Sequence, residues 1–365
     1  MNQQREGEFL ASCLAPRVDE IRPSELEQLS APQWEDLLQQ ANRHGVTPLL
    51  YHRLNTLKLG PFIPSDVVQR LREAYVKSAM RNVHLYHELS KLLSVLHREG
   101  IPVIVLKGAH LAEVVYGNIA LRPMVDVDLL VRKTDLSKVE VKLLRLGYVP
   151  HKEESWWRHN HFHVPYILQG EGIRLEVHWN IDRSTSPSEL DIEGIWERAQ
   201  PATIAGVKVL VMSGEDLLLY LCWHVSFLHK FQIGLRPLCD ISQTITHYRA
   251  EINWELVQLR ARQWRIERCV YLTFYLASKL LEVDVHDEIL PNIKPNTPDA
   301  RVVAWARERI FLHQSPSPSL SVNFVQLWGP RRLSDKVALF LKRAFPSPEI
   351  IAQMYRTAPD SLRTN

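Results

Sequence analysis

Apolar residues recur at helical spacing from about residue 5 to residue 98 of the chain. Helix breaks are expected at four places that contain proline: Pro16, Pro23, Pro32 and the segment 61–64. Within Val83–Arg98, five leucines fall on one helical stripe, and Gly100 follows as a typical residue just past a helix end. The pattern predicts an N-terminal helical region over residues 1–99.

After residue 100, the pattern changes to short runs rich in β-branched residues. IPVIVLKG closes on Gly108, and VDVDLLV forms a second run after the helix-length segment Ala109–Tyr116. Together they predict a strand, a helix and a strand. Thr134 or Asp135 is expected to cap a further helix that runs through Leu146, ahead of another short strand at GYVP.

Two later runs, HFHVPYIL and IRLEVHWNI, flank the turn-like sequence QGEG at residues 169–172, which predicts a β-hairpin. If these four residues form the turn, His163 faces His178, and both imidazoles share the face that carries Glu176. A shift of one residue would reverse the faces. With the run GVKVLVM further along, these strands predict a small α/β sheet domain over residues 100–212.

Helical periodicity returns beyond Ser213, which stands three residues before Asp216 as in a capping box with Asp in place of Glu. The periodicity continues to about residue 281. The sequence QSPSPSL and three further prolines then indicate a loop-rich tail. We therefore expect a C-terminal helical domain over residues 213–365.

Composition excludes several classes of protein. Basic and acidic residues number 44 and 41, so no strong field for an anionic membrane or an extensive nucleic-acid surface is expected. No apolar run approaches the roughly 18 residues that span a bilayer, and the N-terminus lacks the pattern of a secretory signal. Four scattered cysteines without a CxxC pair predict buried free thiols and a cytoplasmic protein: Cys13, Cys222, Cys239 and Cys269.

The candidate chemistry centres on VDVDLLV, where alternation places Asp126 and Asp128 on one face of a strand. A bound divalent cation would remove the repulsion between two such carboxylates. The alternative is structural, with one Asp capping a turn and the other in solvent. Lys107 and Gly108 precede this strand by one helix, at a helix N-terminus suited to phosphate, although a lysine there is also often only solvated.

These residues resemble a known family. LKGAHLAEVVYGNIALRPMVDVDLLV, followed by LEVHWNI, is similar to uncharacterised bacterial nucleotidyltransferase-like proteins of the DNA polymerase β superfamily. The shared features are an hG[GS] motif, a Dh[DE]h motif and a third carboxylate downstream, over about residues 80–285. The resemblance implies an α+β fold, with a small mixed-sheet, polymerase-β-like domain between two helical regions. Ala109 stands where the family usually has Ser or Gly, so backbone N–H groups alone would hold the phosphate there.

The resemblance also implies an activity and its site residues. Asp126, Asp128 and Glu176 would bind two Mg²⁺ or Mn²⁺ ions, and Glu176 would help to deprotonate the attacking hydroxyl. Nucleotide-binding roles would fall to a second set: Lys107, Gly108, Ala109 and Arg122. The enzyme would move an NMP from an NTP, ATP included, to an acceptor hydroxyl and release pyrophosphate. The acceptor stays open between a small molecule, a peptide, a protein and a tRNA end.

Other polar residues have two interpretations each. His163 and His178 either contact substrate or metal, or form a pair at the edge of a hydrophobic face. A metal triad of His163 with His159 and His161 is a weaker hypothesis. Arg122 either grips the triphosphate or pairs with an acid.

In the helical domain, three residues match a pattern of the same family and are expected in structural or acceptor-side roles: His224, Arg236 and Asp240. A buried ion pair of Arg236 with Asp240 within the helix is the commoner explanation. Two alternatives to catalysis also remain for the whole chain. The first is an inactive nucleotide sensor or docking module on the same fold, which Ala109 favours and the three carboxylates disfavour. The second is a purely structural core whose acids are incidental.

Overall fold

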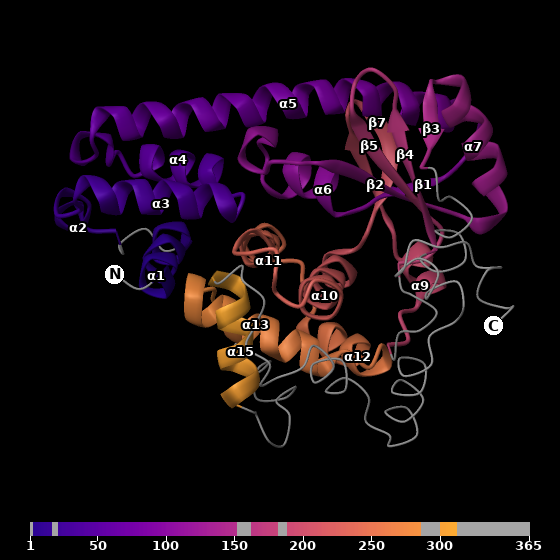
Figure 1. Cartoon of the computed structure of the whole chain (residues 1–365). Helices are drawn as coiled ribbons and strands as arrows, with labels where there is room; N and C mark the ends of the chain where they lie inside the picture. Colours follow the sequence, from indigo (N-terminus) through magenta and orange to yellow (C-terminus); the bar gives the residue numbers. More distant parts are fainter. Residues whose placement is uncertain (1–2, 17–20, 152–161, 182–187, 286–299, 312–365) are drawn as a thin grey trace, which may run out of the picture.

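The computed structural model describes residues 3–16, 21–151, 162–181, 188–285 and 300–311. Its N-terminal part is helical, as the periodicity predicts (Figure 1). Five helices make up this part: α1 (Gln3–Leu14), α2 (Pro23–Glu27), α3 (Ala31–Arg43), α4 (Thr47–Thr56) and α5 (Ser65–Arg98).

Helix α5 extends the stripe expected over Val83–Arg98 toward the N-terminus. It begins at Ser65 and has 34 residues, so the predicted segment is only its C-terminal half. Its end is confirmed: Gly100 has a φ of +68°, and the N–H of Ile101 donates to the carbonyl of Leu96 at 3.0 Å. The leucines of the stripe are buried against the sheet that follows.

The sheet has seven strands in the order β3-β4-β5-β2-β1-β7-β6. Their bounds are β1 (Val103–Val105), β2 (Asp126–Val131), β3 (Tyr148–Pro150), β4 (His163–Leu168), β5 (Ile173–His178), β6 (Gln200–Ile204) and β7 (Val207–Val211). Strand β2 is parallel to β5 and antiparallel to β1, so the predicted α+β fold with a mixed sheet is confirmed. The sequence did not predict β6, a largely exposed edge strand that contains Pro201.

The predicted hairpin register is confirmed. His163 pairs with His178 across β4 and β5, and Leu168 pairs with Ile173 next to the turn, where Gly170 has a φ of +82°. On its other side, β5 pairs with β2, where Glu176 lies beside Asp128. The register therefore places acids and imidazoles side by side on three neighbouring strands.

The two faces of β2 pack against different layers. Val127, Leu129 and Val131 face a core that includes buried leucines of α5 and of α7 (Leu136–Arg145). Leu130, on the opposite face, packs in a core that includes the C-terminal helices. Because successive side chains alternate across a strand, Asp126 and Asp128 point toward these helices.

The C-terminal helices lie below the sheet in the view of Figure 1. They are α9 (Ile192–Glu197), α10 (Gly214–Trp223), α11 (Arg236–His247), α12 (Trp254–Gln263), α13 (Glu267–Leu281) and α15 (Ala300–Phe311), with a π-helical turn at His224–Leu228 after α10. Helix α1 packs against α13 and α15, so both helical regions share one core. The boundaries at residues 99 and 212 stay a prediction.

The capping box expected at Ser213 and the free cysteines can both be compared with the structure. Ser213 caps α10 by accepting a hydrogen bond from the N–H of Asp216, but the Asp216 carboxylate binds Arg198 and Arg260, so only half of the capping box forms. All four cysteines are buried and free, as expected. The predicted loop-rich tail, from QSPSPSL at 314–320 onward, lies outside the described residues.

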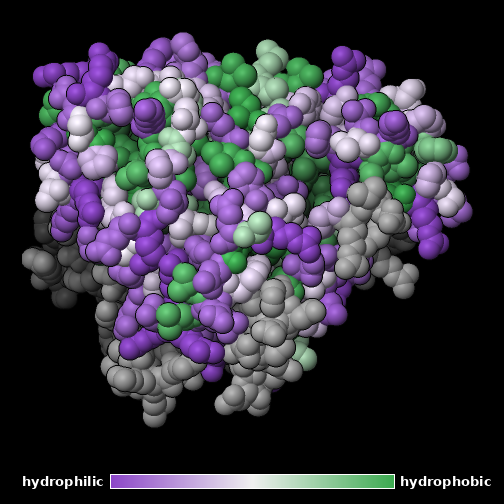
Figure 2. Space-filling view, turned by 180° about the vertical axis from the view of Figure 1, so that it is seen from behind, coloured by the Kyte–Doolittle hydropathy of each residue, from purple (hydrophilic) through white to green (hydrophobic). Residues whose placement is uncertain are grey.

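Hydrophilic side chains dominate the face of the molecule seen in Figure 2, and apolar residues lie between them in small groups. Large apolar side chains that are exposed among the described residues include Val76, Met80 and Val83, which follow one another along α5. Within the described ranges, no helix is long and apolar enough to cross a membrane.

Gly234 is a position where alanine is expected to be costly. Its φ is +76°, and a Cβ atom there would lie 2.3 Å from Nδ1 of His44. Gly100 has a similar φ of +68° but open space around it. Both substitutions strain the backbone, so Gly234→Ala is expected to lower the free energy of unfolding by about 1–3 kcal/mol more than Gly100→Ala, the usual cost of overpacking. Urea denaturation of the two variants measures the difference, and equal losses would contradict the expectation.

Candidate active site

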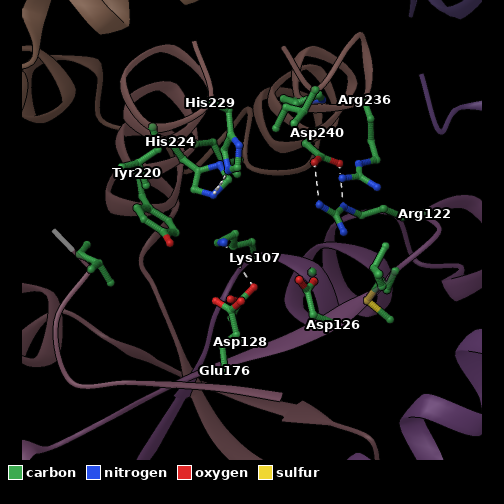
Figure 3. A pocket seen from close by; sticks show the side chains of 18 of the residues that line it. Lys107, Arg122, Asp126, Asp128, Glu176, Tyr220, His224, His229, Arg236 and Asp240 are labelled. Atoms are coloured by element: carbon green, nitrogen blue, oxygen red, sulfur yellow. Dashed lines mark hydrogen bonds and ion pairs between the residues drawn. The ribbon is translucent and has the colours of Figure 1, made fainter. Parts of the chain in front are cut away.

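A pocket of about 420 Å³ lies between the sheet and the C-terminal helices (Figure 3). One wall comes from β2, β5 and the start of α6 (Lys107–His110), and the other comes from α10, α11 and the segment between them. Its volume is typical of sites for small molecules. The charged and polar residues that line it are Lys107, Arg122, Asp126, Asp128, His163, Glu176, His178, Tyr220, His224, His229, Arg236 and Asp240.

Three carboxylates meet in this pocket. Asp126 and Asp128 lie two residues apart on the same face of β2, and Glu176 is the register partner of Asp128 on β5. Burial, followed by the neighbouring charge of Asp128, raises the pKa of Asp126 above its usual value. The cluster therefore has an excess of negative charge that favours a bound cation.

Lys107 and His178 face this negative charge. The Lys107 Nζ lies 3.3 Å from Oδ2 of Asp128, and the His178 Nε2 lies 3.1 Å from Oδ1 of Asp128 and 3.3 Å from Oε2 of Glu176. Burial alone would raise the pKa of Asp128, but Lys107 and His178 outweigh it and hold that pKa well below its usual range. Burial also raises the pKa of Glu176, whereas the interaction with His178 lowers it, and the net pKa of Glu176 is below its usual value.

The helix predicted over Ala109–Tyr116 begins two residues earlier than expected. Helix α6 starts at Lys107, with Leu106 between it and β1, and continues as a π-helical turn at Leu111–Val115. Gly108 lines the pocket, and a Cβ atom there would meet Sδ of Met124 at 3.4 Å. Ala109 is fully buried in the core behind the sheet. A contact between Ala109 and a phosphate would therefore come from its backbone N–H group.

Arg122 forms a buried, two-pronged ion pair across the pocket. Its Nε and Nη2 each donate to a different oxygen of Asp240 at 2.9 Å. The structure therefore shows the second of the two roles expected for Arg122, the pairing with an acid. Its role toward a nucleotide stays a prediction. Burial works against the charge of Arg122, but Asp240 raises the pKa of Arg122 above its usual value.

The expected ion pair between Arg236 and Asp240 is wrong. These residues are one helical turn apart on α11, but Asp240 turns to Arg122 on the opposite wall. Arg236 instead donates from Nη1 to the carbonyl of Pro123 at 3.3 Å, and its Nε is buried without a hydrogen-bond partner in the described part of the chain. Burial, and then the charge of Arg122, lowers the pKa of Arg236.

The two paired histidines are also in the pocket. The rings of His163 and His178 stack with centroids 4.7 Å apart, and the His163 Nε2 lies 3.7 Å from Oε2 of Glu176. The remaining two members of the weaker triad hypothesis, His159 and His161, lie outside the described residues.

Sequence reasoning missed Tyr220 and His229. Tyr220 on α10 lies one turn before His224, the first residue of the π-helical turn, and burial raises the pKa of Tyr220 to about 12. The Nε2 atoms of His224 and His229 lie 3.2 Å apart, and burial, followed by Lys107, lowers the pKa of His224 well below its usual value. The four-residue spacing of Tyr220 and His224 was the available signal, because it places both on one helical face.

Comparison with solved structures gives distant likenesses. Two structures of ANT(2")-Ia, a crystal structure in complex with adenylyl-2"-tobramycin and a solution structure of this antibiotic-resistance factor, are each 15% identical in sequence with a TM-score of 0.36. The match to the crystal structure covers 49% of this chain and 96% of the ANT(2")-Ia chain. The match to the solution structure covers 50% of this chain and 91% of the ANT(2")-Ia chain. Likenesses at this level carry no argument about substrate.

Comparison with protein families is more informative. No curated protein matches the chain. Residues 30–282 match a family described as uncharacterised nucleotidyltransferases, and this range covers more than half of the chain. It includes the sheet, the pocket and helices α10 to α13. The resemblance that rested on the paired aspartates is thereby confirmed, and the chain belongs to the uncharacterised nucleotidyltransferase family.

Proposed function

We propose that this nucleotidyltransferase moves an NMP from an NTP to an acceptor hydroxyl in the pocket described above, with divalent ions held by Asp126, Asp128 and Glu176. The observation that carries the proposal is the convergence of these three carboxylates from two adjacent strands on one pocket. Family membership supports NMP transfer in general.

The donor set fits Mg²⁺ or Mn²⁺. These ions prefer oxygen ligands, and three carboxylates supply them. The raised pKa of Asp126 reflects burial and the charge of Asp128, which a divalent ion would offset. Lys107 and His178 contact the oxygens of Asp128 in the structure, so they would exchange these contacts for new ones. When bound, two ions would stabilise the attacking and leaving oxygens of an in-line displacement.

Cationic side chains give the pocket a place for a triphosphate. Lys107 reaches it from the start of α6, and Arg236 lines it from α11 with a buried Nε that lacks a partner among the described residues. An anion beside Arg236 would supply that partner and favour its charged form. We therefore assign Lys107 and Arg236 to the triphosphate, with backbone N–H groups near Gly108 as further donors.

Glu176 is suited to accept the proton of the attacking hydroxyl. In the proposed step, the acceptor oxygen bonds to the α-phosphorus, the bond from that phosphorus to the pyrophosphate oxygen breaks, and the hydroxyl proton passes to the Glu176 carboxylate. Burial raises the pKa of Glu176, but the hydrogen bond and charge of His178 together with His163 lower it by more, so the net pKa is below its usual value and the carboxylate stays in its basic form at neutral pH. His178 also holds Glu176 and Asp128 in place.

The second candidate is a nucleotide sensor that binds an NTP without turnover. Ala109 favours it, because this position has no hydroxyl for a phosphate. The two candidates differ in whether label reaches an acceptor. Incubation of the chain with each labelled NTP, Mg²⁺ or Mn²⁺ and a cell extract tests this directly, and a labelled small molecule, peptide, protein or tRNA identifies the acceptor class. Absence of label with every NTP would favour the sensor.

NTP binding is expected to depend on a divalent metal ion. At an NTP concentration of 100 times Kd, the nucleotide should stabilise the wild type by about 2.7 kcal/mol when Mg²⁺ is present, because it binds only the folded state. Asp128→Ala should abolish this stabilisation, whereas Asp36→Ala, at an exposed position of α3 outside the pocket, should keep it. Thermal unfolding with and without Mg²⁺ measures the effect. Equal stabilisation under both conditions would refute the metal dependence.

A further inference from the structure

The pocket contains a second group of possible metal ligands that differs in chemistry from the three carboxylates. One ligand atom from each of His163, Glu176 and His178 lies within 4.8 Å of the other two. The Oε2 of Glu176 is 3.3 Å from Nε2 of His178 and 3.7 Å from Nε2 of His163. Tetrahedral Zn²⁺ with ligands at about 2.0–2.1 Å has ligand atoms about 3.4 Å apart, so small shifts would place one ion among these three.

Sheet pairing holds the group in position. His163 and His178 are register partners at the end of the hairpin, and their rings stack at 28°. Both rings direct Nε2 toward the same carboxylate oxygen. Two imidazolium ions stacked in this way would repel each other, whereas one cation shared by two neutral rings and the carboxylate satisfies all three.

Ligand type then separates the two sites. Imidazole nitrogen suits Zn²⁺, Co²⁺ and Ni²⁺, whereas Mg²⁺ prefers oxygen and retains water. The three side chains leave a fourth position open, next to the Asp128 oxygen that lies 3.1 Å from Nε2 of His178. Glu176 would be a ligand in both sites, so occupation of one removes it from the other.

We propose that His163, His178 and Glu176 bind one zinc-class transition-metal ion, and that this ion inhibits the enzyme by taking Glu176 from its role toward the acceptor hydroxyl. The inhibitory half rests on the function proposed above, but the binding half does not. Zinc would then act as a negative regulator at the active site itself.

Metal titration without nucleotide tests the binding half. Metal-free, full-length protein is titrated with Co²⁺, and the visible absorption of nitrogen-ligated, four-coordinate Co²⁺ is followed. We expect saturation at one ion per chain and full displacement by Zn²⁺ but not by excess Mg²⁺. His163→Asn should weaken Zn²⁺ binding by about 10- to 100-fold or more, the scale for loss of groups that support a metal site. His87→Asn, on the exposed side of α5, is the matched control and should bind like the wild type.

The outcomes separate this proposal from the proposed function. Equal Zn²⁺ affinity in the wild type and His163→Asn overturns the site, whatever the transfer assay shows. Glu176→Gln provides a second ligand variant, and circular dichroism of both variants confirms that they are folded. Zinc binding that depends on His163, in a protein without label transfer, would support the site and contradict catalysis. Transfer with Mg²⁺ that Zn²⁺ fails to inhibit, despite binding at His163, would overturn the inhibitory half alone.

Discussion

Glu176→Gln is expected to cut NMP transfer by on the order of 10²-fold or more and to leave metal-dependent NTP binding largely intact. Glutamine keeps the size of the side chain but cannot accept the proton of the attacking hydroxyl. Asp126 and Asp128 remain to bind the metal, so the loss should fall on turnover. Label transfer at saturating NTP, measured beside a direct NTP affinity for each protein, separates the two effects.

Glu171→Gln is the matched control, because it makes the same change at the exposed turn of the same hairpin. It should transfer label at the rate of the wild type. Equal transfer by Glu176→Gln and the wild type would rule out Glu176 as the third catalytic carboxylate. If the wild type binds NTP with Mg²⁺ but transfers nothing, the sensor becomes the better hypothesis.

Asp240→Asn is expected to lower the free energy of unfolding by about 3–5 kcal/mol, the usual cost of removing one partner from a buried ion pair. Asparagine has nearly the same volume but no charge, so it leaves the Arg122 guanidinium buried without its carboxylate. It also weakens the acceptor for the Tyr116 hydroxyl, which donates to Asp240 at 3.0 Å. Urea denaturation monitored by circular dichroism measures the loss.

An exposed ion pair offers the comparison. Nη2 of Arg249 lies 2.8 Å from Oδ2 of Asp284, and the two side chains are 74% and 61% exposed. Asp284→Asn should therefore lower the free energy of unfolding by no more than about 1 kcal/mol. A double variant, Arg122→Met with Asp240→Leu, should recover much of the stability lost in Asp240→Asn because it leaves no unpaired charge. Similar losses in Asp240→Asn and Asp284→Asn would show that burial of the pair matters little.

Local patterns predicted the sheet wall of the site well. The alternation in VDVDLLV placed Asp126 and Asp128 on one face, and the structure puts apolar neighbours on the other. The QGEG turn set the hairpin register, which brought His163 opposite His178. Both inferences depend only on the two-residue period of a strand and on turn geometry, which neighbouring residues determine.

Contacts between the walls were beyond this kind of inference. Arg122 and Asp240 are 118 residues apart, and the pair depends on how α11 packs against the sheet. Tyr220 enters the pocket from α10, so its place depends on how the helices pack against the sheet. Arg236 is much nearer to Asp240 along the chain and was the partner expected from the sequence. Tertiary packing instead brings Arg122 to Asp240, where the guanidinium donates to both carboxylate oxygens.

The division of the pocket into a sheet wall and a helical wall has a consequence for how such enzymes diversify. Side chains on β2 and β5 are tied to one pairing register, so an insertion or deletion there would turn the acids away from the pocket. Pocket-facing positions on α10 and α11 have no pairing register, so apart from Asp240 and Arg236 a residue there can be exchanged without turning the acids away. Gene duplication followed by drift at these positions would therefore reshape the pocket around an unchanged acidic centre.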